Sequence, residues 1–248
     1  MLFTYAIPTI VYRVPDVNPV LRRRDRVRAA TQSELTSAAR ELLVTGGTEA
    51  VTVRSIASAL GMTAPAIYRY FDSREALLDA LIDALYDELA AELISVRDAA
   101  GSLAGRFLET SRAFRRWALA HRAEFGLLFG APIPGVGELG DASADRGQRF
   151  GALWLELFIE LAARDREVVR WRRPIPDRLR AQVTDYVESI GGVVDTDTAL
   201  LFLACWERLY GAVCTEVFGH LAFALDDAEE LFEDQLLDVA ERLGIGPP

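Results

Sequence analysis

The chain has 248 residues, of which 51% are hydrophobic and 26% charged, and this composition excludes a wholly disordered protein. Its apolar runs, such as Ala199 to Trp206, are far shorter than the roughly 20 residues of a membrane-spanning helix, so we expect a soluble protein without membrane partners. The net charge of −10 is unevenly spread, because 10 arginines accompany 7 acidic residues through residue 75 and 17 accompany 30 afterwards.

The spacing of the two cysteines argues against a disulfide between them and against a metal motif. Cys205 and Cys214 lie nine residues apart in a segment predicted as one helix, about 13.5 Å apart along its axis, and cannot bridge each other there. The sequence therefore offers no disulfide framework and no Cys-x-x-Cys metal motif. Both observations fit a reducing compartment, and we expect a cytoplasmic protein.

Residues 1–21 are apolar, but they contain three prolines and no basic N-terminal region, which makes a poor secretion signal. We expect a flexible N-terminal tail or a start site assigned too early. The sharpest basic excess of the chain follows directly. Five arginines occur within the seven residues Arg22-Arg23-Arg24-Asp25-Arg26-Val27-Arg28.

The first predicted helices follow this basic run. Apolar residues recur at three- and four-residue spacing over 27–42, and Gly46-Gly47 is expected to end that helix. Thr52 can cap a second helix of about two turns, which Gly61 ends.

After this break, Thr63 can cap a third short segment over residues 64–71, and a long helix is predicted from Arg74 to about Ala100. Further helices are predicted at about 103–120, 121–129, 143–170, 175–190, 196–222 and 227–243. Because no segment shows sustained period-two alternation, the predicted fold class is all-α.

The second and third segments have the form of a helix-turn-helix, with two short helices joined by a tight glycine turn. In such a motif the second helix enters the major groove, where small side chains permit close approach and hydroxyl and guanidinium groups donate hydrogen bonds. The predicted DNA-facing residues of this segment are Ala64, Ala66, Tyr68, Arg69 and Tyr70. Ile67 and Phe71 are expected to hold the segment to the core.

Many residues between Ser33 and Leu78 stand at the positions of one family signature. They are Ala38-Ala39, Gly47, Thr52, Ile56-Ala57, Gly61, Thr63, Tyr68, Phe71, Ser73-Arg74-Glu75 and Leu77-Leu78. In this pattern the stretch resembles the DNA-binding domain of TetR-type bacterial transcriptional regulators.

The resemblance implies that Arg54 reads a base, that Tyr68 and Tyr70 contact phosphates or bases, and that Arg74 grips a phosphate. The complete predicted DNA-binding set is Thr52, Arg54, Thr63, Ala64, Ala66, Tyr68, Arg69, Tyr70 and Arg74. The arginine run at 22–28 allows two interpretations, an arm that reaches the minor groove or nearby phosphates and a solvated flank.

The resemblance also implies a homodimer, with the last two helices as the interface, and a small-molecule pocket among the C-terminal helices. A pocket lined by aromatic residues would suit a hydrophobic or aromatic effector, while for each residue taken separately plain core packing is the commoner role. The residues predicted for it are Trp117, Phe125, Phe129, Trp154, Phe158, Trp206 and Tyr210. The expected organisation is a tail over 1–21, a DNA-binding domain with a basic arm over 22–75, and an effector-binding and dimerisation domain over 76–248.

The predicted function is a ligand-responsive repressor that binds a near-palindromic operator. One alternative is a DNA-binding regulator without a small-molecule effector, controlled by a protein partner, which a pocket filled by its own side chains would favour. Another is an enzyme on a helical scaffold, but no catalytic motif supports it. The G-x-G-x-x-G spacing at residues 135–140 follows a helix rather than a strand, so we expect a loop and no cofactor. We expect no metal, because His121 and His220 lie far apart.

Overall fold

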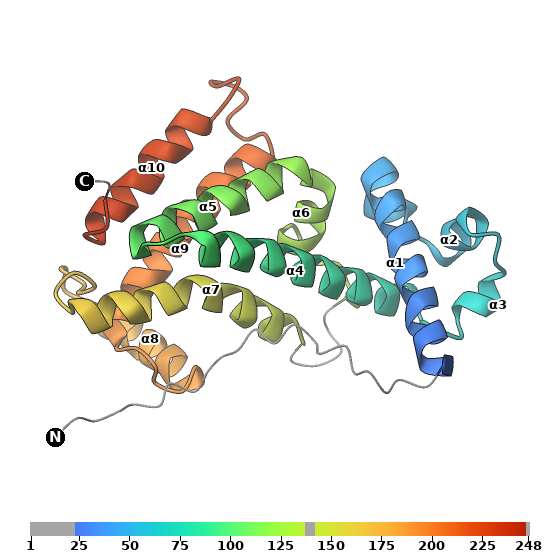
Figure 1. The fold of residues 1–248 in the computed structure, drawn as a ribbon, viewed down its shortest axis with the longest axis horizontal. Coiled ribbons are helices and arrows are strands. Elements are labelled where there is room, and N and C mark those ends of the chain that lie inside the picture. The colour runs from blue at the N-terminus through green and yellow to red at the C-terminus, as the bar shows by residue number, and fades with distance from the viewer. Residues whose placement is uncertain (1–22, 137–141, 247–248) are drawn as a thin grey trace. The chain divides into compact units, whose positions relative to one another are not determined.

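The computed structural model describes residues 23–136 and 142–246, and all regular secondary structure in these ranges is α-helical (Figure 1). The helices are α1 Arg23–Ala50, α2 Val53–Ala59, α3 Ala64–Ile67, α4 Arg74–Ala99, α5 Leu103–Ala120, α6 Arg122–Phe129, α7 Ala142–Arg164, α8 Asp177–Ser189, α9 Thr196–Val217 and α10 Glu229–Arg242. The all-α prediction is confirmed. The predicted tail and most of the 135–140 loop lie outside the described residues.

Helix α1 differs from its prediction at both ends. It begins at Arg23, so Arg23 to Arg28 belong to the helix instead of forming an arm that precedes it. Arginine favours helices and nothing in this run breaks one. At the other end Gly47 adopts φ +71° and ψ −175°, a conformation that glycine takes without strain, so the helix is kinked where its end was predicted and continues to Ala50.

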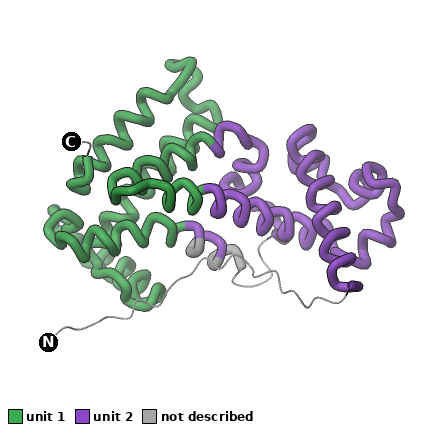
Figure 2. The backbone as a smooth tube through the Cα atoms, viewed as in Figure 1, with its two compact units in different colours: residues 1–12, 93–116, 151–248 green, residues 13–92, 117–150 purple. Residues whose placement is uncertain are grey.

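The described residues form two compact units, coloured separately in Figure 2. Unit 1 contains residues 93–116 and those from 151 onward, and unit 2 contains the described residues up to 92 and from 117 to 150. Helices α4, α5 and α7 each contribute to both units. Residues of α4 and α6 complete the core of the helix-turn-helix, and the domain boundary expected at residue 75 stays a prediction.

The core of unit 2 fixes the helix-turn-helix. Ile56 of α2, Ile67 of α3 and Leu78 of α4 are fully buried, and the same cluster contains the buried Leu81 of α4 and Leu127 of α6. Burying a side chain of this size stabilises a fold by about 1.5–3 kcal/mol, so this core holds both short helices in place. The predicted anchoring role of Ile67 is confirmed, and Phe71 is buried in the same cluster.

Helix α9 lies at the centre of unit 1 and packs against α8 and α10. Ion pairs add to this packing, because Arg115 of α5 binds Glu216 of α9 through two bonds of 2.6 and 2.7 Å, and Arg112 of α5 binds Glu233 of α10. A short αL turn follows α9 at Gly219, and an irregular segment then connects it to α10. None of the described helices is long and apolar enough to cross a membrane.

Candidate nucleic-acid interface and ligand cavity

The turn between α2 and α3 has the local geometry that a helix-turn-helix requires. Thr52 caps α2 as predicted, since its Oγ1 accepts a hydrogen bond of 3.0 Å from the Ser55 backbone N–H. Gly61 adopts φ +62° between the two helices. Thr63 occupies the N-cap position of α3, but its hydroxyl makes no capping hydrogen bond and the residue is exposed. Its hydroxyl therefore remains free for a partner outside the chain.

Most of the side chains predicted to face DNA lie on α3 or in the turn that follows it. Tyr68 is 50% exposed, a large fraction for an aromatic residue, and Arg69 beside it is exposed. Arg54 on α2 is also exposed, while Ala64 and Ala66 present small, half-buried surfaces. Helix α3 ends at Ile67, so Tyr68 to Tyr70 form a turn instead of continuing the helix. Unit 2 thus presents hydroxyl and guanidinium donors next to small residues, an arrangement that fits the major groove.

The N-terminal arginines of α1 lie beside this surface. Arg23, Arg24 and Arg28 line an open cleft together with Arg69 and Tyr70. The guanidinium carbon of Arg28 lies 5.5 Å from the centroid of the Tyr70 ring, within the range of a cation–π interaction. The start of α1 therefore extends the positive surface of the helix-turn-helix.

Arg74 has a role within the protein that the sequence did not reveal. Its Nε donates a 2.6 Å hydrogen bond to the carbonyl oxygen of Val51, and its Nη2 donates one of 2.6 Å to the carbonyl oxygen of Thr48. These bonds fasten the start of α4 to the last turn of α1 and to the residue that follows it. Because this geometry directs the guanidinium at the protein's own backbone, the phosphate contact expected for Arg74 stays a prediction.

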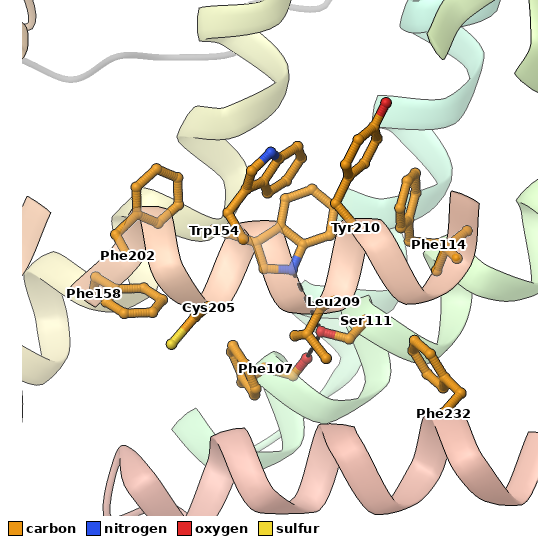
Figure 3. Close-up of a pocket in the computed structure, with 12 residues that line it drawn as sticks. Phe107, Ser111, Phe114, Trp154, Phe158, Phe202, Cys205, Leu209, Tyr210 and Phe232 are labelled. Carbon is orange, nitrogen blue, oxygen red and sulfur yellow. Dashed lines mark hydrogen bonds between the residues drawn. The ribbon is translucent and has the colours of Figure 1, made fainter. Parts of the chain in front are cut away.

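Unit 1 contains an aromatic cavity of about 20 Å³, which has room for about one water molecule (Figure 3). Its lining comes from α5, α7, α9 and α10 and comprises Phe107, Ser111, Phe114, Trp154, Phe158, Phe202, Cys205, Trp206, Leu209, Tyr210, Val213 and Phe232. None of these described lining residues is charged. The cavity is therefore suited to an apolar guest, but its own side chains fill most of it.

Aromatic contacts and two linked hydrogen bonds fix the geometry of this cavity. Trp206 stacks on Tyr210 with ring centroids 5.5 Å apart and meets Trp154 edge-on at 5.4 Å. The hydroxyl of Ser111 donates to the carbonyl oxygen of Phe107 at 2.9 Å and accepts from the indole N–H of Trp154 at 3.5 Å (Figure 3). The chain thus supplies partners for these polar atoms itself, which lowers the cost of an apolar environment.

Four of the seven residues predicted for the pocket line this cavity, namely Trp154, Phe158, Trp206 and Tyr210. The other three, Trp117, Phe125 and Phe129, belong to unit 2. Trp117 is 2% exposed, stacks on His121 with centroids 4.9 Å apart, and has a buried indole N–H without a partner among the described residues. Phe125 and Phe129 pack against each other at 4.8 Å. Trp117 and Phe125 are buried in the other unit and Phe129 is half-buried there, so their contact with a ligand stays a prediction.

Sequence reasoning missed most of the α5 and α9 faces of the cavity. Phe107, Ser111 and Phe114 recur at spacings of four and three residues on α5, and Phe202, Cys205 and Leu209 recur at three and four residues on α9. This periodicity is visible in the sequence, but it marks any buried helix face, whether it borders a cavity or solid core.

Two family models match the chain, and similar proteins support them. Residues 35–81 match the model for bacterial regulatory proteins of the tetR family, and residues 107–239 match a tetracyclin repressor-like C-terminal domain. The HTH-type transcriptional regulator Rv1816 of Mycobacterium tuberculosis is 29% identical over 218 residues, which cover 86% of this chain and 92% of that protein.

Solved structures show the same architecture. The structure of a regulatory protein, SCO4313, is 26% identical with a TM-score of 0.68, covering 89% of this chain and 100% of that one. A TetR/AcrR-family regulator from Thermobifida fusca, 18% identical with a TM-score of 0.55 over 85% of this chain and 96% of that one, shares the fold. Because the C-terminal match alone spans more than half of the 248 residues, the chain belongs to the TetR family of DNA-binding bacterial transcriptional regulators.

Proposed function

We propose that this regulator is a homodimeric repressor that a small hydrophobic or aromatic effector releases from a near-palindromic operator. The observation that carries the proposal is the uncharged aromatic cavity, which lies in a different unit from the helix-turn-helix. A regulator that senses a ligand needs a ligand site and a DNA site that are separate and coupled.

On the DNA side, two copies of α3 would engage successive major grooves about 34 Å apart. The exposed side chains of Arg54, Tyr68 and Arg69 supply the donors for bases and phosphates. The neighbouring arginines of α1 supply further positive charge at the edge of the same surface. Much of the affinity would then come from phosphate contacts and would weaken as salt rises.

On the ligand side, an effector must displace side chains, because 20 Å³ is too small for an organic molecule. Trp206 and Tyr210 are half-buried and are the side chains best able to swing aside. The effector would therefore favour an expanded state of unit 1. We expect that state to tilt α4, which contributes residues to both units, and to disfavour DNA binding by population shift.

Exposed apolar residues after α9 and on α10 support the dimer. Phe218, Phe223 and Leu225 are exposed in the segment that follows α9, and Leu231 is exposed on α10. Apolar side chains gathered on one part of a surface are typical of an interface between subunits. We therefore place the dimer contact on the last two helices, at the end of α9, the start of α10 and the segment that joins them.

A second candidate is a regulator controlled by a protein partner, without a small-molecule effector. The specific observation in its favour is the small size of the aromatic cavity, which its own side chains nearly fill. In that case the aromatic cluster is a hydrophobic core, and the signal reaches the DNA-binding unit through a protein contact.

The first experiment is a fluorescence-anisotropy titration of the full-length protein against its own upstream intergenic DNA at two salt concentrations. We expect saturable, sequence-selective binding that weakens as salt rises, and a higher Kd for Tyr68→Phe, which removes one exposed hydroxyl. A folded dimer that binds no more tightly to this DNA than to a scrambled sequence contradicts the assignment of a neighbouring operator.

The effector is tested with N-phenyl-1-naphthylamine, an uncharged aromatic probe that fluoresces in apolar surroundings. Probe binding should raise the operator Kd, and Val213→Phe, which adds bulk to the cavity lining, should abolish this response while leaving DNA binding unchanged. Selective DNA binding without any probe binding would favour the partner-controlled regulator.

A further inference from the structure

A second concave surface of unit 1 is lined by arginines. It is a groove of about 330 Å³ between the segment that follows α7, the outer side of α9 and the end of α10. Arg172, Arg173, Arg208 and Arg242 all line it. Acidic residues outnumber arginines by 30 to 17 after residue 75, so four arginines around one groove are an unusual local concentration.

Little of this positive charge is neutralised within the described chain. Arg208 pairs with Asp238 at 2.7 Å. Arg242 instead donates hydrogen bonds to uncharged carbonyl oxygens, from Nη1 to Val168 at 3.0 Å and from Nη2 to Arg170 at 2.8 Å. Arg172 and Arg173 are exposed, and neither forms an ion pair or hydrogen bond with another described residue. The groove therefore keeps a clear excess of positive charge.

Arg242 anchors the backbone of the segment that precedes the two exposed arginines. Its hydrogen bonds to residues 168 and 170 hold the segment that leads into Trp171, Arg172 and Arg173 against α10. Both of these consecutive arginines line the groove. Arginine suits this position because its planar donors bind carboxylate, sulfonate or phosphate oxygens in pairs.

The floor of the groove is apolar. Leu201 and Val239 are each 3% exposed, and the half-buried Trp171 borders the same space. Burial raises the pKa of the Cys205 thiol to about 11, so this floor residue is uncharged at neutral pH. A volume of about 330 Å³ falls within the range of small-molecule sites, and an apolar floor with a few convergent polar groups is their usual composition.

We propose that this groove binds a small organic anion, with its carboxylate, sulfonate or phosphate group on Arg172 and Arg173 and its apolar body over Leu201, Val239 and Trp171. The groove and the aromatic cavity border adjacent faces of α9, and Cys205 lines both. This ligand differs in charge from the neutral effector of the aromatic cavity, so the two sites are separable by experiment.

The test compares two fluorescent probes on the full-length protein. 1-Anilinonaphthalene-8-sulfonate carries an anionic group, and N-phenyl-1-naphthylamine has the same aromatic body without it. In the variant R172A/R173A the Kd of the sulfonate probe should rise at least about tenfold, while that of the neutral probe stays constant. The charge-reversed variant R172E/R173E should bind the sulfonate probe still more weakly.

The matched control is R178A/R180A, which removes two exposed arginines of α8 that do not line the groove and should leave both probes unchanged. Melting temperatures of the variants should match that of the unaltered protein, because the replaced guanidinium groups hold no described partner. Equal Kd values for the sulfonate probe in R172A/R173A and in the control would overturn the proposal.

The proposal would also be overturned if the sulfonate probe stopped binding to the Val213→Phe variant but still bound to R172A/R173A, because the anion would then bind in the aromatic cavity. The aromatic cavity is judged separately, by the neutral probe and Val213→Phe. Failure of the anion site therefore leaves the proposed effector site standing, and failure of the effector site leaves the groove standing.

Discussion

Two arginines five residues apart, Arg69 and Arg74, carry the same charge in different surroundings. Arg69 follows α3 with its side chain exposed, whereas Arg74 begins α4 and donates two hydrogen bonds to the carbonyl oxygens of Val51 and Thr48. Removing the Arg74 guanidinium takes a charged donor from the carbonyl groups of Val51 and Thr48, and Thr48 keeps only the 3.2 Å bond from the Val51 backbone N–H. Removing an exposed guanidinium has no such cost. We therefore expect the two side chains to serve DNA binding and stability respectively.

Arg74→Ala should lower the free energy of unfolding by about 1–3 kcal/mol, because two carbonyl groups lose a charged donor. Arg69→Ala should leave that free energy unchanged and raise the operator Kd. Urea unfolding followed by circular dichroism measures the first quantity and fluorescence anisotropy the second. An Arg74→Ala protein of unaltered stability with weakened DNA binding would restore the phosphate role expected from the family resemblance.

The sequence identified these residues by type and position but could not tell their roles apart. An arginine that binds a phosphate and one that donates hydrogen bonds to a neighbouring loop look the same in sequence, because both lie near a helix N-terminus. The difference depends on where residues 48 and 51 lie in space, which local spacing does not determine. For Thr52, by contrast, the capping bond reaches only to Ser55, and the sequence predicted it correctly.

At the level of elements, the start of α1 adds charge to the helix-turn-helix surface. Replacing Arg23, Arg24 and Arg28 by alanine should reduce the salt dependence of operator binding, because each lost phosphate contact lowers the slope of log K against log salt by about 0.9. Measuring Kd at four or more salt concentrations gives this slope. An unaltered slope would mean that the arginines are a solvated flank.

Helix α9 depends on the cap at its first turn. The Asp195 carboxylate accepts a 2.9 Å hydrogen bond from the Thr198 backbone N–H and pairs with Arg166 at 2.7 Å. Partial burial raises the pKa of Asp195, but the bonds from Thr198 and Arg166 more than offset this, and the pKa lies below its ordinary value. The cap therefore stabilises α9 in its ionised form.

Asp195→Ala should lower the free energy of unfolding at pH 7 by about 1 kcal/mol, while Asp195→Asn, which keeps a capping oxygen, should lose less. Because the pKa is lowered on folding, the stabilisation by the carboxylate is complete above its ordinary pKa of about 3.9 and disappears as pH falls through the lower folded value. Denaturant unfolding at pH 7 and under acid conditions tests the sign. A difference in stability between the unaltered protein and the Asp195→Asn variant that widens in acid contradicts it.

Local sequence signals predict the positions of helices well, whereas they do not determine to which unit a buried side chain belongs. Residues 103–120 were predicted and observed as one helix because amphipathic periodicity and flanking breakers are local signals. Trp117 and Trp154 look alike by these signals, yet the first is core of unit 2 and the second lines the cavity of unit 1. Only the packing of α5 and α7 distinguishes them, and packing depends on contacts distant in sequence.

For the whole molecule, operator recognition depends on dimerisation, since one helix-turn-helix reads only half of a near-palindromic site. The segment between α9 and α10 presents Phe223 with 88% of its surface exposed, a cost that a partner subunit would remove. In a two-fold dimer the interface buries one copy of Phe223 from each subunit. One substitution should therefore cost about 3–6 kcal/mol of dimer stability.

Phe223→Asp should consequently yield a folded monomer whose operator affinity falls sharply, because free energy that once came from dimer formation must now be supplied by DNA binding. Sedimentation equilibrium gives the mass and anisotropy the affinity. Leu179→Asp, at an exposed apolar position on α8, is the matched control and should remain dimeric with normal DNA binding. A Phe223→Asp protein that stays dimeric would move the interface away from this segment. Parallel loss in both variants would instead indicate a general effect of adding an acidic residue to unit 1.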